Sequence, residues 1–441
     1  MSEPASGVEV AYYGDDVTGS VDVLLQFTRL GRRGRLFVGV PDAASLAVAA
    51  EENEIVGIAG ISRSLRTEDI DAEVRPALEA LKRLQPRIVQ YKACSTADSS
   101  PAIGSIGRVI EIGRDVFASG AVPMLFAQPD FGRYTVFTHH FAADAGVVYR
   151  LDRQPTMSTH PSTPMGESDL AVHLGLQTSL PIGALPFTSY SSAEDIASAL
   201  RDTRAAAVVL DALDDAHLSM LGDAIRLHSR DAAPLFAIGS GGLSRALGLS
   251  RTAPVDSAPD AAPAASGRAV LAVSGSRSQQ TRRQMDAAAR AGWIVRPLPL
   301  GPGDGDGASA IASVVAELRA GRSVALTSDD APHGGADPLA AIARAGAEVI
   351  RAAVTSGATD RVVVCGGDTS GRVVRMLGIE SVSIVAHPPG NVVVLRAHAS
   401  APGMDGVELV LKGGQMGRID LLEDLRTGRT APLAEVSLDG D

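Results

Sequence analysis

The sequence has few cysteines and no long hydrophobic run. Its two cysteines, Cys94 and Cys365, are far apart in the chain, so it has neither a disulfide framework nor the cysteine spacing of a zinc site. The longest apolar runs are far shorter than the ~20 residues that a membrane-spanning helix needs. The first ten residues lack the basic start and apolar core of a signal peptide. These absences predict a cytoplasmic protein.

Aromatic residues make up only 4% of the chain, and the formal net charge is −11. This acidic balance excludes a general nucleic-acid binder, whose footprint is a basic surface. Small anionic substrates remain open, because a local cluster of Arg and Lys can bind them whatever the total charge. With few aromatics, Ala, Val, Leu and Gly have to build the core, which suits helices docked closely on a sheet.

Short β-branched runs alternate with amphipathic patterns along most of the 441 residues, a length that predicts two domains. This alternation is typical of mainly parallel sheets covered on both faces, so the predicted fold class is α/β. The segment 251–267 is rich in Ala, Pro and Ser and is predicted to be a linker between domains at 1–250 and 268–441. The predicted strands are 8–12, 36–40, 55–59, 88–91, 124–127, 207–210, 269–273, 324–327, 361–365 and 407–411. The predicted helices are 21–30, 69–84, 192–202, 278–291, 339–356 and 372–377.

Two adjacent aspartates, Asp15 and Asp16, lie between the first predicted strand and a helix, and Thr18 and Gly19 follow them. One interpretation is an ordinary turn in which an aspartate caps the helix. The other is a functional pair, because neighbouring carboxylates repel each other unless a metal, a cationic side chain or an abstracted proton shares the site. The motif alone does not decide between the two.

Basic and hydroxyl side chains follow two later strands of the first domain. Arg63 follows one of them, and Lys92 follows the next, together with Ser95 and Asp98. Ligands bind outside the carboxyl ends of parallel strands, so these side chains predict an anion pocket. The alternative is a solvent-facing loop with a helix N-cap before Pro101.

Two further loops of the first domain stand out. The segment 157–165 is polar and punctuated by proline, and its His160 could contact substrate or transfer a proton. A merely hydrogen-bonded or exposed histidine is the alternative. The segment 130–136 contains Arg133, to which the sequence assigns no role.

Three glycine-rich turns follow strands of the second domain, at 274–278, 365–371 and 412–417. Small residues let a backbone approach a phosphate, and the free N–H groups of a helix N-terminus bind the anion, so these turns predict a nucleotide site. Neither a P-loop nor a dinucleotide fingerprint is present. The turn at 239–243 is similar, and the run 301–307 lacks the last acidic ligand of a calcium loop and is interpreted as a flexible loop.

Together these motifs resemble the four-carbon acid sugar kinase family, whose members phosphorylate threonate, erythronate, 3-oxo-tetronate and related acids with ATP. The resemblance runs over nearly the whole chain. Its landmarks are Asp15-Asp16-Val17-Thr18-Gly19, Tyr91-Lys92, Cys94-Ser95-Thr96, Asp98-Ser99, Gly132-Arg133-Tyr134, Met157, His160-Pro161, Thr163-Pro164-Met165, Gly239-Ser240-Gly241, Gly275-Ser276, Gly366-Gly367-Asp368-Thr369-Ser370 and Lys412-Gly413-Gly414. Two features depart from the family pattern: Gly-Gly-Gln-Met-Gly follows Lys412 where relatives usually have Ser-Gly-Asn-Phe-Gly, and Gly14 replaces the commoner Ala. Both spare the glycines and carboxylates, so they bear on substrate or nucleotide detail and not on the reaction.

The resemblance implies a sugar-acid-binding N-terminal domain, a nucleotide-binding C-terminal domain and an active site in the cleft between them. The implied reaction transfers the γ-phosphoryl group of ATP, with Mg²⁺, to the terminal hydroxyl of a four-carbon sugar acid. Asp16 is the expected base, and Asp15 is expected to orient substrate or Mg²⁺. The other expected site residues are Arg63, Lys92, Thr18, Ser95, Asp98 and His160 for the sugar acid, and Ser276, Gly275, Gly366, Gly367, Asp368, Thr369, Gly413 and Gly414 for ATP.

Two other functions stay open at this point. One is a kinase for a branched or oxidised relative such as 3-oxo-isoapionate. The other is a non-catalytic sensor that closes on a sugar acid, although a sensor does not need a nucleotide-type domain. The expected partners are small molecules, without nucleic acid or membrane, and a homo-oligomer is left open.

Overall fold

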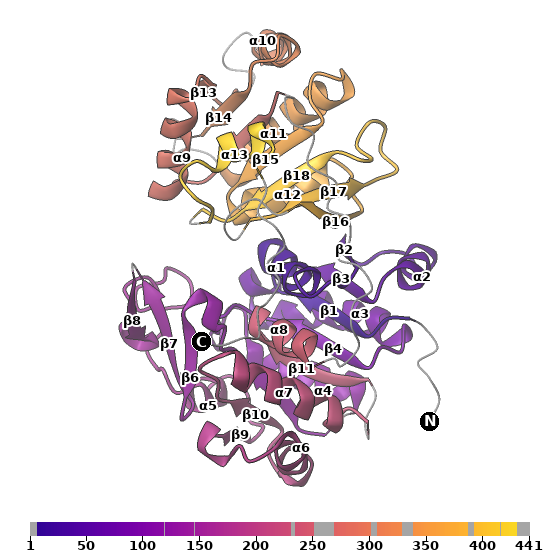
Figure 1. Ribbon diagram of the computed structural model, residues 1–441, viewed down its shortest axis with the longest axis vertical. Helices are drawn as coiled ribbons and strands as arrows, with labels where there is room; N and C mark the ends of the chain where they lie inside the picture. The colour runs from indigo at the N-terminus through magenta and orange to yellow at the C-terminus, as the bar shows by residue number, and fades with distance from the viewer. Residues whose placement is uncertain are drawn as a thin grey trace. The chain divides into compact units, whose positions relative to one another are not determined.

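Each half of the chain folds around a mainly parallel sheet with helices on its faces (Figure 1). The computed structural model describes residues 7–118, 120–144, 146–230, 234–250, 269–300, 307–328, 338–386, 392–414 and 416–429. The chain divides into two units, residues 1–258 and 259–441. The predicted linker at 251–267 and most of the predicted loop at 301–307 lie outside the described residues. Within those ranges, no helix is both long and apolar enough to cross a bilayer.

The main sheet of the first unit has the strand order β2-β3-β1-β4-β11-β5-β10-β9, and all of its neighbouring strands are parallel. The central strands are buried along their whole length, as expected when helices cover both faces. The strands are β1 Val10–Gly14, β2 Gly34–Val38, β3 Ile55–Ala59, β4 Ile88–Lys92, β5 Val122–Leu125, β9 Ile182–Leu185, β10 Ala207–Leu210 and β11 Leu235–Gly239. The helices are α1 Val17–Thr28, α2 Ala43–Glu52, α3 Ile70–Arg83, α4 Ile106–Phe117, α5 Leu170–Gly175, α6 Ala193–Asp202, α7 Asp215–His228 and α8 Gly241–Leu249.

The chain changes direction across this sheet between β1 and β4. From β1 it continues to β2 and β3 on one side, whereas from β4 it continues to strands on the other side. The helix after β1, α1, packs against α8, and the helix after β4, α4, packs against α3. Parallel sheets bind ligands outside the carboxyl ends of their strands at such a switch point. The loops that follow β1 and β4 are therefore the first place to look for a site.

A small antiparallel sheet stands beside the main sheet (Figure 1). It consists of β6 Arg133–Val136, β7 His139–Asp144 and β8 Val147–Arg150. The β6–β7 turn has positive φ angles at Phe137 and Thr138, 48° and 67°. Both turn residues donate their backbone N–H to the carboxylate of Asp211, at 2.6 and 3.0 Å. This hydrogen bonding fixes the hairpin to the end of β10.

The second unit has the strand order β13-β14-β12-β15-β18-β17-β16, in which β17 runs antiparallel to both of its neighbours. The other paired strands are parallel. A buried core that includes Trp293 and Met285 covers the sheet. The strands are β12 Leu271–Ser274, β13 Ile294–Pro297, β14 Val324–Thr327, β15 Arg361–Cys365, β16 Ser381–Ala386, β17 Val394–His398 and β18 Glu408–Lys412. The helices are α9 Gln279–Arg290, α10 Gly307–Arg319, α11 Pro338–Thr355, α12 Gly367–Met376 and α13 Leu421–Thr427.

The structure confirms the predicted α/β class and shifts several predicted bounds. The first helix begins at Val17, four residues before its predicted start, because Asp16 caps it. The strand predicted at 36–40 ends at Val38, where Gly39 with a φ of 93° turns the chain away. The strand predicted at 124–127 lies at Val122–Leu125. Helix α4 begins after Ser105, so the N-cap considered before Pro101 is wrong.

Candidate active site

The two adjacent aspartates follow β1 and have different surroundings. The Asp15 side chain is 4% exposed and that of Asp16 is 32% exposed. Asp16 has an extended backbone, and its Oδ1 accepts a hydrogen bond from the N–H of Gly19 at 2.5 Å, which makes it the N-cap of α1. Helix capping therefore explains the contact of one Asp16 oxygen, Oδ1. It explains no contact of the Asp15 carboxylate.

The guanidinium of Arg63 joins both carboxylates. Its Nε and Nη2 donate to Oδ2 and Oδ1 of Asp15 at 3.0 and 2.6 Å, and its Nη1 lies 2.5 Å from Oδ2 of Asp16. Burial raises the pKa of the Asp15 carboxyl, Arg63 opposes that rise and Asp16 adds to it. The cation that two neighbouring carboxylates require is thus supplied by the chain itself. The sequence predicted Arg63 as part of an anion pocket for the sugar acid, whereas here its donors face the aspartates.

Lys92 completes this group at the end of β4. Its buried side chain donates from Nζ to the carbonyl of Ala93 at 2.8 Å. A Cβ atom added to Gly19 would lie 2.7 Å from Asp16 Oδ1, 3.0 Å from Lys92 Nζ and 3.5 Å from Arg63 Nη2. The side chains of Asp16, Lys92 and Arg63 therefore converge on the space that a side chain at Gly19 would occupy. We call Asp15, Asp16, Arg63 and Lys92 the aspartate cluster.

Thr18 lies beside the aspartate cluster in the first turn of α1. Its Oγ1 is buried and has no hydrogen-bond partner among the described residues. A buried hydroxyl without a partner costs about 1–3 kcal/mol. A ligand group that pairs with Thr18 would recover that cost.

Asp98 and His160 meet in a second group, through Thr163. The Thr163 hydroxyl donates to Asp98 Oδ1 and lies 2.8 Å from His160 Nδ1. The N–H of Thr163 also donates to His160 Nδ1 at 3.2 Å, so in the neutral ring the proton is on Nε2. Among the described residues, no hydrogen bond or ion pair joins Asp98 or His160 to the aspartate cluster.

Ser95 is held by a histidine that the sequence does not identify. His140 on β7 donates from Nε2 to the Ser95 carbonyl at 2.7 Å, and its Nδ1 lies 3.0 Å from Thr135 Oγ1. Burial lowers the pKa of His140 to about 4, so the ring is neutral at pH 7. The histidine ties the small sheet to the loop after β4. Its partner lies 45 residues away, and only the fold brings the two together.

The three glycine turns of the second unit converge. A Cβ atom on Gly275 would overlap Thr369 Oγ1, and one on Gly414 would lie 2.7 Å from Ser276 Oγ. Gly366 has a φ of 115°, and its Cβ position is 3.4 Å from the N–H nitrogen of Ser276. Gly367 begins α12, while the Asp368 side chain lies outside what the structure describes. The turns after β12, β15 and β18 thus place small residues and backbone N–H groups together, as phosphate binding requires.

A buried lysine lies behind these turns. Lys412 Nζ donates to Thr281 Oγ1 and to the carbonyl of Gly413, both at 3.0 Å. Thr281 Oγ1 in turn is within hydrogen-bond distance of Ser276 Oγ, at 3.2 Å, and of the Gly414 carbonyl, at 2.9 Å. Burial lowers the pKa of Lys412. The amine therefore contacts the turn after β18 directly and reaches Ser276 through one hydroxyl. The sequence signal for Lys412 was its place at the end of a strand before two glycines.

Comparison with known proteins agrees with the division into two units. The family model of a sugar-binding N-terminal domain matches residues 10–247, and that of a nucleotide-binding C-terminal domain matches residues 271–422. The 3-oxo-isoapionate kinase of Paraburkholderia graminis is 37% identical, covering 97% of this chain and 96% of its own. The 3-oxo-tetronate kinase of Methylobacterium radiotolerans is 32% identical (92% and 96%), and the D-threonate kinase of Bordetella bronchiseptica is 30% identical (94% and 96%). The chain belongs to the four-carbon acid sugar kinase family.

Two solved structures share the fold of this four-carbon acid sugar kinase. A Salmonella typhimurium protein aligns with a TM-score of 0.77 at 24% identity, covering 94% of this chain and 98% of the other. A Haemophilus influenzae protein aligns with a TM-score of 0.72 at 21% identity, covering 94% and 99%. At this identity, the likeness shows the architecture alone.

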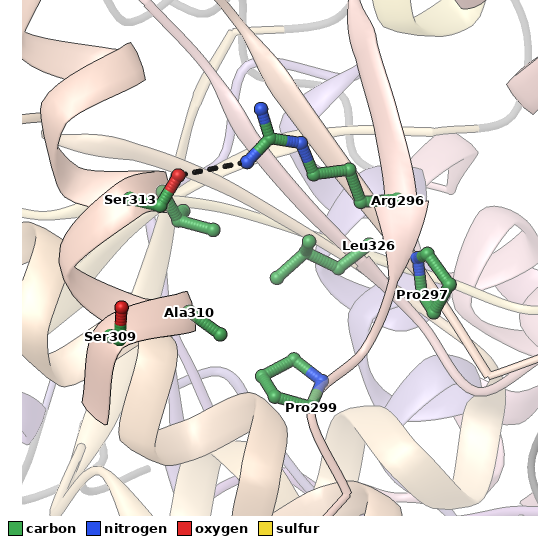
Figure 2. Close-up of a pocket in the computed structure, with 8 residues that line it drawn as sticks. Arg296, Pro297, Pro299, Ser309, Ala310, Ser313 and Leu326 are labelled. Atoms are coloured by element: carbon green, nitrogen blue, oxygen red, sulfur yellow. Dashed lines mark hydrogen bonds between the residues drawn. The ribbon is translucent and has the colours of Figure 1, made fainter. Parts of the chain in front are cut away.

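Two hollows in the second unit of the kinase lie apart from its glycine turns. One of about 230 Å³ is lined by residues of β13, β14 and α10; at its edge Arg296 donates to Ser313 Oγ at 3.0 Å (Figure 2). The other, of about 600 Å³, is lined by residues such as Ala269 and Asp360 that precede β12 and β15. None of the expected site residues lines either hollow. The convergence of loops at strand ends is what marks the site.

Proposed function

We propose that this chain transfers the γ-phosphoryl group of ATP to the terminal hydroxyl of a short sugar acid. The acid would be threonate, erythronate or 3-oxo-tetronate, or the branched relative 3-oxo-isoapionate. The observation that carries the proposal is the aspartate cluster, a carboxylate pair with its own countercharges at the switch point of a parallel sheet. The converging glycine turns of the second unit supply the phosphate-binding part that a kinase needs.

On the acceptor side, we assign the base to Asp16 and a supporting role to Asp15. Two carboxylates face one guanidinium and one ammonium group, so their negative charges are balanced within the cluster. Asp16 is 32% exposed and pairs with Arg63 through Oδ2, whereas both oxygens of Asp15 are held against Arg63 and its side chain is only 4% exposed. An exposed carboxylate can receive the proton of the attacking hydroxyl, which is typically worth ~10²–10⁴ in rate. Arg63 then positions the pair and balances its negative charge.

On the donor side, the turn residues fit the phosphates of ATP. Any side chain at Gly275 or Gly414 would fill the space in front of Ser276 and Thr369, so the backbone can approach a phosphate there. The same role is proposed for Gly366, Gly367, Asp368 and Gly413. The domains are proposed as 1–250 and 268–441 with the linker between them, and the cytoplasm, which supplies ATP, as the compartment.

Mg²⁺ is proposed to enter with the nucleotide. The described residues contain no group of three or more His, Cys, Asp or Glu arranged for a metal ion. A Mg²⁺ ion on ATP needs only one or two protein carboxylates, because phosphate oxygens and waters complete its shell. When bound, it neutralises charge on the phosphates. The Asp16 side chain is 32% exposed, and Asp16 is the residue proposed to contact the ion.

A coupled assay for ADP tests the proposal. Purified protein with Mg-ATP is offered D- and L-threonate, D- and L-erythronate, 3-oxo-tetronate and 3-oxo-isoapionate, and the product is analysed by mass spectrometry and ³¹P NMR. We expect ADP release that depends on one of these acids and a phosphate ester on its terminal carbon. The 3-oxo-isoapionate is the first to try, because the relative named for it shares 37% identity with this chain. Binding of acid and ATP without ADP release would instead indicate a sensor.

A further inference from the structure

Arg133 is a half-buried cation whose donors are not all used. Its Nη1 donates to the carbonyls of Phe131 and Ala143 at 2.8 and 3.2 Å. Its Nε is buried and has no hydrogen-bond partner among the described residues. In the part of the chain that the structure describes, no carboxylate lies within ion-pair distance of the guanidinium, although Asp144 is near enough to interact with it electrostatically. Leaving a buried N–H of a charged group unpaired is costly, so a side chain kept in this state suggests an anionic ligand.

The fold holds the backbone of Arg133 firmly at the carboxyl ends of the main strands. Arg133 exchanges two backbone hydrogen bonds with Gln128, which follows β5, at 2.9 and 3.1 Å. Two residues on, Thr135 exchanges a pair with Ala212, which follows β10, at 3.1 Å each. Gly132 has a φ of 67°, and a Cβ there would lie 2.7 Å from the Cβ of Ala143. A binding group that is fixed in this way loses little conformational entropy when its ligand arrives.

The guanidinium lies by the loop that follows β4. Residues two apart on a strand share a face, so Arg133 shares one with Thr135, which contacts His140 and through it the Ser95 carbonyl. Burial lowers the pKa of Arg133, and Cys94 and Asp144 oppose that shift. On Arg63, burial and the two aspartates act first, and Cys94 again raises the pKa. Cys94 therefore acts electrostatically on both guanidinium groups, one in the aspartate cluster and one on the small sheet.

We propose that Arg133 binds the carboxylate of the sugar acid. The inference rests on the proposed function and replaces the role first given to Arg63, whose donors are taken by Asp15 and Asp16. A guanidinium offers parallel N–H groups that match a carboxylate, which a lysine does not. With its carboxylate at Arg133, the acid extends past Cys94 toward the aspartate cluster, so that its terminal hydroxyl reaches Asp16.

The test compares the acid with the tetritol that lacks its carboxylate. Steady-state kinetics are measured for the wild type, Arg133→Met, Arg133→Lys and the control Arg150→Met. Arg150 lies on β8 of the same small sheet, and its guanidinium pairs with Asp152. We expect Arg133→Met to raise the KM for the acid by about 10- to 100-fold, the range for a lost hydrogen bond to a charged group. The KM for ATP and the kcat/KM for the tetritol stay at the wild-type value. Arg133→Lys recovers part of the loss, and Arg150→Met behaves as wild type.

Direct titration of the acid into ATP-free protein separates this proposal from the proposed function. If the wild type binds a tetronate but turns none over, the kinase assignment fails, while loss of binding in Arg133→Met still supports the carboxylate site. If Arg133→Met binds the acid within twofold of wild type, the carboxylate site is wrong. Equal losses on acid and tetritol mean a structural role and overturn it as well. Should Arg133→Met fail to fold, Arg133→Lys makes the same comparison.

Discussion

At the scale of single residues, burial separates two chemically identical side chains. Asp15 is enclosed and held through both oxygens by Arg63, while Asp16 is 32% exposed, caps α1 with Oδ1 and pairs with Arg63 through Oδ2. A proton acceptor has to be accessible, and of the two aspartates Asp16 is the more exposed. Asp15 instead keeps Arg63 in place, and through Arg63 it fixes the orientation of Asp16.

Replacing each aspartate by asparagine distinguishes these roles. Asp16→Asn keeps an oxygen for the cap but removes the base, so we expect kcat to fall by about 10²-fold or more, with a smaller loss of stability than Asp15→Asn because its ion pair with Arg63 is more exposed. Asp15→Asn leaves Arg63 with half of its countercharge on the buried side and should lower the free energy of unfolding by about 3 kcal/mol. Steady-state kinetics and urea unfolding check both variants. Retention of more than a tenth of wild-type turnover in Asp16→Asn would show that Asp16 is not the base.

Gly19→Ala should separate activity from stability. The added methyl would press on the flexible ends of Asp16 and Lys92, at 2.7 and 3.0 Å, and not on backbone. Alanine also favours a helix over glycine by up to about 1 kcal/mol. We therefore expect unchanged or slightly higher stability in urea, with kcat/KM for the acid lowered about tenfold or more. Gly175→Ala on α5, with nothing within 4 Å, is the control. A fully active Gly19→Ala would show that the convergence of side chains does not matter.

At the scale of elements, the sequence predicted the parts that packing dictates. The central strands β3, β4 and β15 are β-branched runs buried on both faces, which makes them visible without any structure. The small sheet was not predicted, because its turn uses Phe137 and Thr138 at positive φ where hairpins normally use glycine or asparagine. Asp211, more than seventy residues later, stabilises that turn. Such long-range compensation leaves no local signal.

The same limit applies to the candidate site. Residues after strand ends could be selected from sequence, since the carboxyl edge of a parallel sheet gathers them. Which of these residues pair with one another could not be predicted from sequence. Arg63 pairs with Asp15, 48 residues earlier, and Lys412 donates to Thr281, 131 residues earlier. Side-chain pairing therefore had to come from the structure.

His140 joins the small sheet to the loop after β4 and should make stability depend on pH. Its pKa is about 4 in the folded state, against ~6.5 for an unperturbed histidine. Above pH 6.5 both states are neutral; as pH falls, the unfolded state takes up a proton that the folded state refuses. By pH 5 this costs about 2 kcal/mol of stability. Urea unfolding at pH 7.5 and 5.0 should show this loss in the wild type and a smaller one in His140→Gln.

The comparison between the two proteins isolates His140 from other groups. Burial also lowers the pKa of His173, whose contribution has the same sign and stays in the variant. The amide of glutamine can still donate toward Ser95, so the tie itself is kept. If both proteins lost the same stability between pH 7.5 and 5.0, His140 would not be the group that titrates.

Replacing Lys412 tests the role of the junction between β18 and the glycine turn that follows it. Lys412→Met keeps the length and apolar packing of the side chain but removes the cation behind Thr281 and Gly413. We expect the affinity for ATP and ADP to fall by about 10- to 100-fold, with adenosine binding unchanged, because the charge acts on phosphates. Isothermal titration with the three ligands measures this. A parallel loss for adenosine would mean that the turn itself had collapsed.

At the scale of the whole molecule, two units with separate cores should each respond to their own ligand. Core residues of the first unit, such as Tyr13 and Phe236, belong to one buried cluster, and those of the second, such as Trp293, belong to another. Two cores of this kind do not have to unfold together. The family models divide the chain in the same way, into a sugar-binding and a nucleotide-binding part.

Calorimetry of the full chain should therefore show two unfolding transitions, each shifted by one ligand. A ligand at a hundred times its Kd stabilises its unit by about 2.7 kcal/mol, which for a unit of this size raises its Tm by about 5–10 °C. ADP should shift one transition and the sugar acid the other. Lys412→Met should reduce the ADP shift to about half or less and spare the acid shift, and Arg133→Met should do the reverse. A single transition that either ligand moves would show instead that the two units unfold as one, so that binding to either stabilises both.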